Sequence, residues 1–175
     1  MLFGKRISLR PMRECDLDWF YDGYSDLRNR GGHYPLRIRS EPHVRRTFAE
    51  DGYWRDDDGM LIIVDADGAR LGYIEYFRPI GYLDAYELGY LLFDATAAGH
   101  GYVTEACRLL VDHLFETKRV NRLEVRIHPD NAASIRIAEK CRFAFESIAR
   151  GVWYHRGRHH DLQVHALLRA DWSAG

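Results

Sequence analysis

The sequence predicts a mixed α+β fold, in which about seven mostly antiparallel strands form one sheet with helices on both faces. Three segments carry this prediction. Within residues 60–77, two apolar runs flank Asp67 and Gly68, a pair that is typical of tight hairpin turns. Residues 101–117 carry one apolar stripe at helical spacing, and residues 122–128 alternate strictly between polar and apolar side chains.

The first half of the chain contains a strand and two helices before this hairpin. Residues 5–10 alternate as a strand does and end at a proline. Residues 14–24 hold apolar side chains at helical spacing, with aspartates near the start, where the helix dipole favours acidic groups. Residues 28–39 contain glycine and proline and predict a loop. Ser40 is then the expected cap of a second helix over 41–54.

The second half alternates strands and helices. Asn131 precedes an apolar segment and is a preferred residue at a helix N-cap. No internal repeat or linker interrupts the pattern, so we expect one domain over residues 1–175. The predicted strands are 60–64, 70–77, 84–93, 122–128, 143–152 and 161–168, and the predicted helices are 101–117 and 132–141.

Composition excludes several classes of function. Apolar residues make up 46% and charged residues 29% of 175 residues, which is typical of a globular protein. The net charge of −1 disfavours a nucleic-acid partner. No apolar run is long enough to cross a membrane. The three cysteines are widely spaced and show no zinc pattern, so we expect no metal, free thiols and a cytoplasmic location.

The segment 94–104 lies between a predicted strand and the clearest predicted helix. It contains Gly99 and Gly101 just before the apolar stripe begins. A helix start exposes unpaired N–H groups and a partial positive charge, and glycine lets that backbone approach a phosphate closely. The segment therefore fits a pyrophosphate, although a glycine-rich turn without any ligand is the alternative. The sequence has neither a P-loop nor a GxGxxG motif.

Three segments together resemble the GNAT superfamily of acyl-CoA N-acyltransferases, and in particular its branch of ribosomal-protein-alanine acetyltransferases, RimJ and RimL. They are the strand YELGYLL at 86–92, the segment AGHGYVTEA at 98–106 and the helix region HPDNAASIRIAEKCRF at 128–143. The resemblance covers nearly the whole chain, with its motifs in the expected order.

The sequence departs from the family pattern at four positions. Ala98 stands where many members have Gln or Arg, and Val103 where a small residue is usual. Arg142 replaces a glycine after the last helix, where a left-handed conformation would be strained. Many relatives protonate the leaving thiolate with a tyrosine at the position of Ala138. The first two departures leave the backbone donors of the loop intact.

The resemblance implies acetyl-CoA as co-substrate. Its pantetheine arm is expected in a splayed gap between strands 84–93 and 122–128, paired with strand backbone like an added strand. Asn131 has two interpretations, a plain N-cap or a cap that also contacts the coenzyme. The expected coenzyme-binding residues are Leu91, Leu92, Phe93, Ala98, Gly99, His100, Gly101, Tyr102, Val103, Thr104 and Asn131.

Two residues are the catalytic candidates. Glu87 lies on the strand beside the gap among apolar neighbours that could raise its pKa, which suits a general base for the amine. The alternative is a strand carboxylate paired with an arginine of the neighbouring strand. The RimJ and RimL branch has a serine at the position of Ser134, proposed to assist the thiolate; otherwise Ser134 is an ordinary polar residue of the first helical turn.

The acceptor site is expected between the 28–39 loop and the last hairpin, with Tyr34, Trp153 and Tyr154 as substrate-contacting residues. The arginines of that loop either attract an acidic acceptor or are simply solvated. The function expected is direct acetyl transfer to a primary amine of a protein N-terminus or small molecule, by a monomer or homodimer. The alternatives are a non-catalytic acyl-CoA-binding or regulatory module, and an enzyme acting on nucleotide phosphates.

Overall fold

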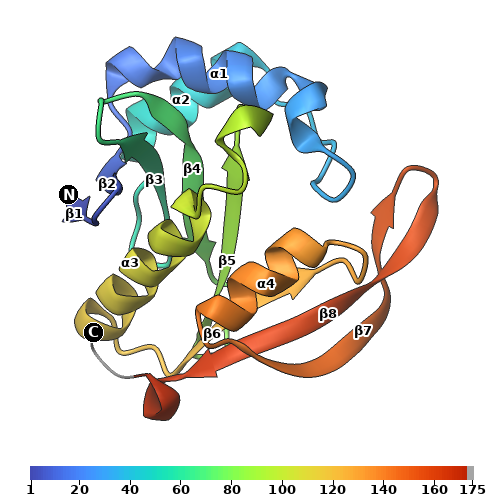
Figure 1. The fold of residues 1–175 in the computed structure, drawn as a ribbon. Helices are drawn as coiled ribbons and strands as arrows, with labels where there is room; N and C mark the ends of the chain where they lie inside the picture. Colours follow the sequence, from blue (N-terminus) through green and yellow to red (C-terminus); the bar gives the residue numbers. More distant parts are fainter. Residues whose placement is uncertain (173–175) are drawn as a thin grey trace.

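The computed structural model describes residues 1–172. Its strands form one sheet in the order β1-β2-β3-β4-β5-β6-β8-β7, with helices on both faces (Figure 1). Neighbouring strands are antiparallel except for β5 and β6, which are parallel. The fold class is therefore confirmed. The last three residues of the predicted domain, 173–175, lie outside the described residues.

Every predicted strand and helix is present, and the sheet has eight strands because the two-residue β1 was not predicted. The strands are β1 (Leu2–Phe3), β2 (Ile7–Pro11), β3 (Asp58–Asp65), β4 (Arg70–Phe77), β5 (Ala85–Leu92), β6 (Arg122–Ile127), β7 (Ala144–His155) and β8 (Arg158–Leu168). The helices are α1 (Leu17–Ser25), α2 (Glu41–Asp51), α3 (Tyr102–Thr117) and α4 (Ala132–Lys140), and short 3-10 turns lie at η1 (Glu14–Asp16), η2 (Leu27–Arg30), η3 (Ala95–Ala97) and η4 (Arg169–Asp171).

Helix α2 ends three residues earlier than the sequence predicts. Gly52 adopts a left-handed conformation with φ of 64° and donates its N–H to the carbonyl of Phe48. Glycine tolerates this conformation without a steric penalty, so it terminates the helix.

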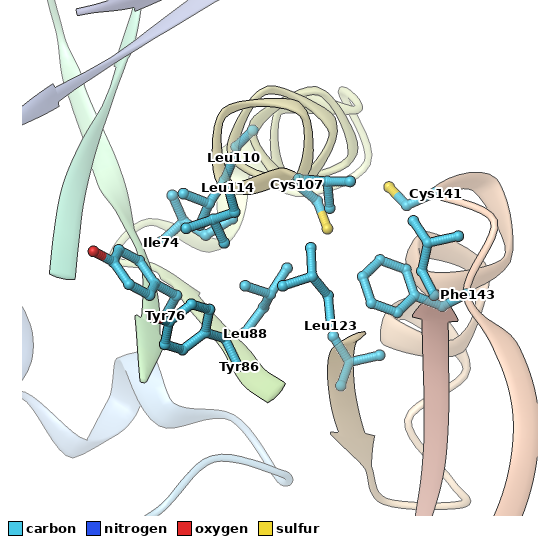
Figure 2. Packing of buried hydrophobic residues seen from close by; sticks show 14 of the residues in the cluster. Ile74, Tyr76, Tyr86, Leu88, Cys107, Leu110, Leu114, Leu123, Cys141 and Phe143 are labelled. Carbon is cyan, nitrogen blue, oxygen red and sulfur yellow. The ribbon is translucent and has the colours of Figure 1, made fainter. Parts of the chain in front are cut away.

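Helices α3 and α4 cover one face of the sheet. Leu110 and Leu114 of α3 are fully buried and lie over Ile74, Leu88 and Leu123 of the central strands (Figure 2). Burying each leucine contributes about 1.5–3 kcal/mol. This packing fixes the position of α3, and with it the helix start that follows β5.

Helices α1 and α2 cover the opposite face. Phe20 of α1 and Val44 of α2 are fully buried and pack with Ile62 and Tyr73 in a second core cluster. Successive strand residues point to opposite faces, so Tyr73 belongs to this core while Ile74 belongs to the other. The central strands are therefore held between two apolar layers.

Strands β5 and β6 pair at one end only and then diverge (Figure 1). The last of their three pairs joins Glu87 to Glu124. Beyond it, β5 stays paired with β4 as far as Leu92, and β6 stays paired with β8 as far as Ile127. Beyond this pair, each strand therefore stays bonded to its neighbour on the far side from the gap, while the edge that faces the gap has no strand partner among the described residues. The splayed gap predicted between these strands is confirmed.

The turn after α4 contains Arg142 at the position where the family has a glycine. Arg142 has φ of 67°, the left-handed conformation that is strained for a residue with a side chain. The N–H of Phe143 donates to the carbonyl of Ala138 at 2.9 Å, which closes the helix end. Phe143 is 3% exposed, so its burial in the core holds the strained residue in place.

Candidate active site

The glycine-containing loop forms the N-terminus of α3. Gly99 and Gly101 have φ of 82° and 79°, and Gly101 is the N-cap of the helix. Among the described residues, the N–H groups of Gly101, Tyr102, Val103 and Thr104 have no backbone acceptor. Four free donors and the positive end of a 16-residue helix therefore face the end of β5.

Arg6 of the neighbouring segment reaches this loop, a contact that the sequence analysis missed. Its Nη1 donates to the carbonyl of His100 at 2.5 Å, and its Nε lies 3.0 Å from Oε2 of Glu105. Glu105 stands in the first turn of α3, and its hydrogen bonds with the backbone and side chain of Arg6 lower the pKa of its carboxyl despite partial burial. Arg6 thus neutralises the carboxylate nearest the proposed phosphate site.

The three predicted residues at the end of β5 differ in their availability. Leu92 directs its backbone groups to the inner edge, which lacks a strand partner within residues 1–172, whereas those of Leu91 face Tyr73 of β4. Phe93 already donates its N–H to the carbonyl of Leu71 at 2.9 Å. Its ring turns to α1, where it lies 4.9 Å from the ring of Trp19. The N–H of Phe93 is therefore not free for the coenzyme contact that was expected of this residue.

The N-terminus of α4 faces the gap from the other side. The side-chain oxygen of Asn131 accepts the N–H of Ser134 at 3.1 Å, so its role as N-cap is confirmed. Ser134 is half-buried, and its contact with the coenzyme stays a prediction.

Glu87 lies where β5 and β6 begin to part. Its Oε2 is 3.1 Å from Nε of Arg126 on β6, so the ion pair considered as its alternative role exists. Burial nevertheless raises the pKa of Glu87 to about 7, because it outweighs the attraction of Arg126 and is reinforced by the charges of Glu124 and Glu75. A carboxyl with this pKa can accept a proton at physiological pH.

Glu75 is a second carboxyl on the face covered by α1 and α2. A Cβ atom at Gly89 would lie 3.1 Å from its Oε1, so the absent side chain there leaves room for Glu75 to extend over β5. Burial raises the pKa of Glu75. The hydroxyl of Tyr34 lies 2.5 Å from that of Tyr73. Tyr34 therefore lies on the same face of the sheet as Tyr73, and its contact with an acceptor stays a prediction.

An open cavity of about 680 Å³ continues from Glu75 between β4 and α2. Arginines and acidic residues share its wall, so neither sign of charge dominates. Its lining includes Arg37, Arg39, Asp51, Tyr53, Asp58, Glu75 and Phe77. The cavity has room for part of an acceptor molecule.

The two residues of the last hairpin that were predicted to contact the acceptor, Trp153 and Tyr154, have different neighbours. The ring of Trp153 stacks on His155 at 4.2 Å and lies 6.1 Å from His128 of the adjoining segment. Tyr154 is 65% exposed and contacts His159 instead. Neighbouring strand residues point to opposite faces, so Tyr154 cannot share the face of Trp153.

Histidines join the hairpin to the loop before α2. The ring of His33 stacks on His128 at 4.8 Å, and Nε2 of His128 lies 2.9 Å from Nδ1 of His160. Within residues 1–172, no three His, Cys, Asp or Glu side chains are grouped so that they could hold a metal ion. No helix of the same residues is long and apolar enough to span a membrane.

The sequence predicts an acyl-CoA-dependent transferase, and the structure has two features expected of one. The parallel strands β5 and β6 diverge, and a helix with glycines at its N-terminus follows β5. The chain belongs to the GNAT acetyltransferases, because the family model described as an acetyltransferase (GNAT) domain matches residues 6–144. Members of this family use acetyl-CoA.

Similar proteins agree with this assignment. The chain is 32% identical to the probable N-acetyltransferase YjcK of Bacillus subtilis (strain 168) over 98% of both chains. It is 35% identical to the putative ribosomal N-acetyltransferase YdaF of the same organism, over 73% of this chain and 70% of that protein. A solved structure of RimL, a ribosomal L7/L12 alpha-N-protein acetyltransferase in complex with coenzyme A, superposes with a TM-score of 0.81 at 19% identity, covering 94% of this chain and 95% of that one.

Proposed function

We propose that this acetyltransferase moves the acetyl group of acetyl-CoA directly to a primary amine, without an acetylated enzyme intermediate. The observation that carries the proposal is the position of Glu87, a carboxyl with a pKa of about 7 at the point where β5 and β6 part. The strand edge that would take the pantetheine arm begins at the next residue.

The free N–H groups of Gly101 to Thr104 would bind the diphosphate of the coenzyme. The residues before them, Ala98 to His100, form the bend that aims these donors. The inner edge of β5 at Leu92 would pair with the pantetheine amides, and Asn131 would contact the arm from α4. Together these contacts hold the thioester in the gap.

Glu87 would remove the proton that the acceptor ammonium must lose, directly or through one water molecule. Half of Glu87 is ionised at a pH equal to its pKa of about 7, so the base is available under physiological conditions. A strand N–H near Leu91 would stabilise the oxyanion, and the hydroxyl of Ser134 would assist the departing sulfur.

The acceptor that we favour is the N-terminal amine of a protein. Two of the similar proteins carry ribosomal-protein acetylation in their names. The acceptor face offers Tyr34, Trp153 and an open cavity beside Glu75, which suits an extended chain. A small-molecule amine remains the other acceptor class, and we expect a monomer or homodimer in the cytoplasm.

Release of free thiol from acetyl-CoA, measured with a panel of peptide and small-molecule amines, tests the proposal. Turnover with any amine, lost in Glu87→Gln, supports it. Tight binding of coenzyme A in calorimetry without turnover of any amine would instead favour the non-catalytic module. Tyr86→Phe is a suitable control, since its hydroxyl contacts Asp57 away from the gap.

A further inference from the structure

Four arginines lie in the segment that links α1 to α2, and the structure places them in different surroundings. The side chain of Arg28 is 91% exposed, and its Nη2 lies 2.6 Å from Oδ2 of Asp26. Arg30 is only 2% exposed. Arg37 and Arg39 line the cavity between β4 and α2, and of these two Arg39 is the half-buried one. Simple solvation therefore describes Arg28 but not Arg30 or Arg39.

Arg30 and Arg39 lie against one aromatic ring. Cζ of Arg30 is 3.8 Å from the ring centre of Tyr24, and Cζ of Arg39 is 5.4 Å from the same centre. Within residues 1–172, the buried Nε atoms of both arginines and the buried Nη1 of Arg30 have no hydrogen-bond acceptor. No carboxylate of these residues forms an ion pair with either guanidinium. Because buried cationic donors without acceptors are costly, this place favours an anion.

Glu75 brings an opposite charge to the same cavity. It pairs in register with Gly89 of β5, and a Cβ atom at Gly89 would lie 3.1 Å from Oε1 of Glu75. Glu87 stands two residues before Gly89, so both carboxyls lie on one face of the sheet. Among the described residues, no arginine or lysine forms an ion pair with Glu75, and Arg39 is no exception.

Other charged residues of the cavity wall compensate one another. Asp51 forms an ion pair with Arg55, and Nη2 of Arg78 lies 2.7 Å from Oδ1 of Asp57. In the described part of the chain, four charged residues of the wall form no ion pair, and they are Arg37, Arg39, Asp58 and Glu75. The cavity thus presents charges of both signs, which suits a ligand that itself carries a cation and an anion.

We propose that Arg39 is a specificity-determining residue that binds a carboxylate of the acceptor, while the ammonium group of the same molecule lies at Glu75 and Glu87. The inference rests on the proposed function and names its acceptor class, an amine with a carboxylate close to the reacting nitrogen. A guanidinium can bind a carboxylate through two parallel hydrogen bonds. Arg30, against the same tyrosine ring, adds positive charge beside this contact. The carboxylate belongs either to a free amino acid or to an acidic residue that follows a peptide N-terminus.

Matched acceptors test the inference. One pair consists of tripeptides with aspartate or asparagine as the second residue, and the other of an amino acid and its carboxamide. Within at least one pair, wild type should acetylate the acidic member with a kcat/KM about 10- to 100-fold higher, which is the effect of one hydrogen bond between charged groups. A preference within the first pair assigns the carboxylate to a peptide side chain, and one within the second assigns it to a free amino acid.

Variants of the loop separate recognition from folding. Arg39→Gln should bring the ratio between acidic and neutral acceptors close to one, mainly through a loss with the acidic acceptor. Arg39→Lys should keep part of the ratio, because lysine keeps the charge but not the planar pair of donors. Arg39→Glu should reverse the preference, in favour of a tripeptide with lysine as the second residue. Arg28→Gln, from the exposed part of the same loop, should leave the ratio unchanged.

Three results would overturn the inference: equal use of acidic and neutral acceptors by wild type, a ratio unaffected by Arg39→Gln, or an equal loss with both acceptors in that variant. Its failure differs from failure of the proposed function. If coenzyme A binds but no amine is acetylated, calorimetry with the same tripeptides and amino acids on the coenzyme-saturated protein decides the role of Arg39. Tighter binding of an acidic ligand that is lost in Arg39→Gln would support it, and no difference between acidic and neutral ligands would exclude it.

Discussion

Arg126 and Glu87 form an ion pair across the point at which β5 and β6 separate, with Nε of Arg126 3.1 Å from Oε2 of Glu87. Nη2 of Arg126 also lies 3.4 Å from Oε2 of the buried Glu124, so a single guanidinium contacts two carboxyls. The positive charge of Arg126 lowers the pKa of Glu87, but burial raises the same pKa by a larger amount. The balance leaves a carboxyl that titrates near neutrality at the entrance to the gap.

Removing the carboxyl should stop proton transfer without unfolding the protein. We expect Glu87→Gln to lower kcat about 100-fold or more, because general-base catalysis contributes at least that factor. Thiol release under saturating acetyl-CoA measures the loss. Calorimetry with coenzyme A provides the control, and an equal fall in coenzyme affinity would assign Glu87 to binding instead.

The same substitution should stabilise the fold at alkaline pH. The pKa of Glu87 is about 7 in the folded state and near 4.5 in the unfolded chain, so the folded state binds the extra proton between these values. Wild-type stability contributed by this group is therefore present below pH 4.5 and lost as pH rises to 7. Glu87→Gln should raise Tm more at pH 8 than at pH 5; an equal shift at both values would contradict the raised pKa.

Arg126 should set the acidic limb of the pH–rate profile. In wild type, kcat/KM is expected to rise with pH through about 7 as Glu87 ionises. Arg126→Gln removes the charge that lowers this pKa, so the limb should move to higher pH. Arg126→Lys keeps the charge and should move it less. A profile unaffected by either change would mean that another group is the base.

Arg6 and Glu105 should act as a pair at the phosphate site. Without Arg6, the carboxylate of Glu105 remains unneutralised in the first turn of α3, where the diphosphate is expected. Arg6→Ala should therefore raise the Kd for coenzyme A about tenfold, and added salt should reduce the difference. Glu105→Gln in the Arg6→Ala background should recover most of the affinity. Arg45→Ala, which removes an exposed ion pair on α2, is the control.

Substitutions at two glycines with positive φ can distinguish backbone strain from a loss of coenzyme binding. Gly101 and Gly151 both have positive φ, 79° and 59°, so alanine at either costs roughly 1 kcal/mol of stability. A Cβ atom at Gly101 would also lie 2.9 Å from Nη2 of Arg6, whereas Gly151 has no neighbour within 4 Å. Gly101→Ala alone should weaken coenzyme binding, as measured by calorimetry. Equal affinities in the two variants would exclude the α3 start as the site.

Local sequence patterns predicted most of the fold, because hairpin turns, helix caps and apolar periodicity act over a few residues. The left-handed Arg142 could also be expected, since it stands at a glycine position. The two-residue β1 has too little sequence to show a pattern. Trp153 and Tyr154 were placed on one wall although adjacent residues of a regular strand point to opposite faces, and β7 is regular from Trp153 to His155.

The unpredicted site contacts join distant segments. Arg6 meets His100 across 94 positions in the chain, and nothing in the local sequence around either residue indicates it. The pairing of Glu87 with a strand arginine was foreseen as a type of contact, and the structure identifies Arg126.

The histidines that link the loop before α2 to the last hairpin should make the fold sensitive to acid. Nδ1 of His128 accepts the N–H of Asp130 at 3.1 Å, so its hydrogen lies on Nε2 and is donated to Nδ1 of His160 at 2.9 Å. Burial, together with the charges of His33, His160 and Arg158, lowers the pKa of His128 despite the opposing charge of Asp130. The neutral ring is therefore the folded form.

Because the pKa of His128 is lower in the folded state than in the unfolded chain, the unfolded state binds the extra proton first as the pH falls. The stability associated with His128 is present above pH 6.5, the ordinary histidine pKa, and is lost as the pH drops toward the folded value. His128→Phe keeps an aromatic ring against His33 and Trp153 but cannot be protonated. Between pH 7.5 and 5.5, the Tm of His128→Phe should fall less than that of wild type. His159→Phe is the control, because His159 lies on the face occupied by Tyr154, and its Tm should fall as much as that of wild type. Parallel Tm curves for all three proteins would show that the acid sensitivity originates elsewhere.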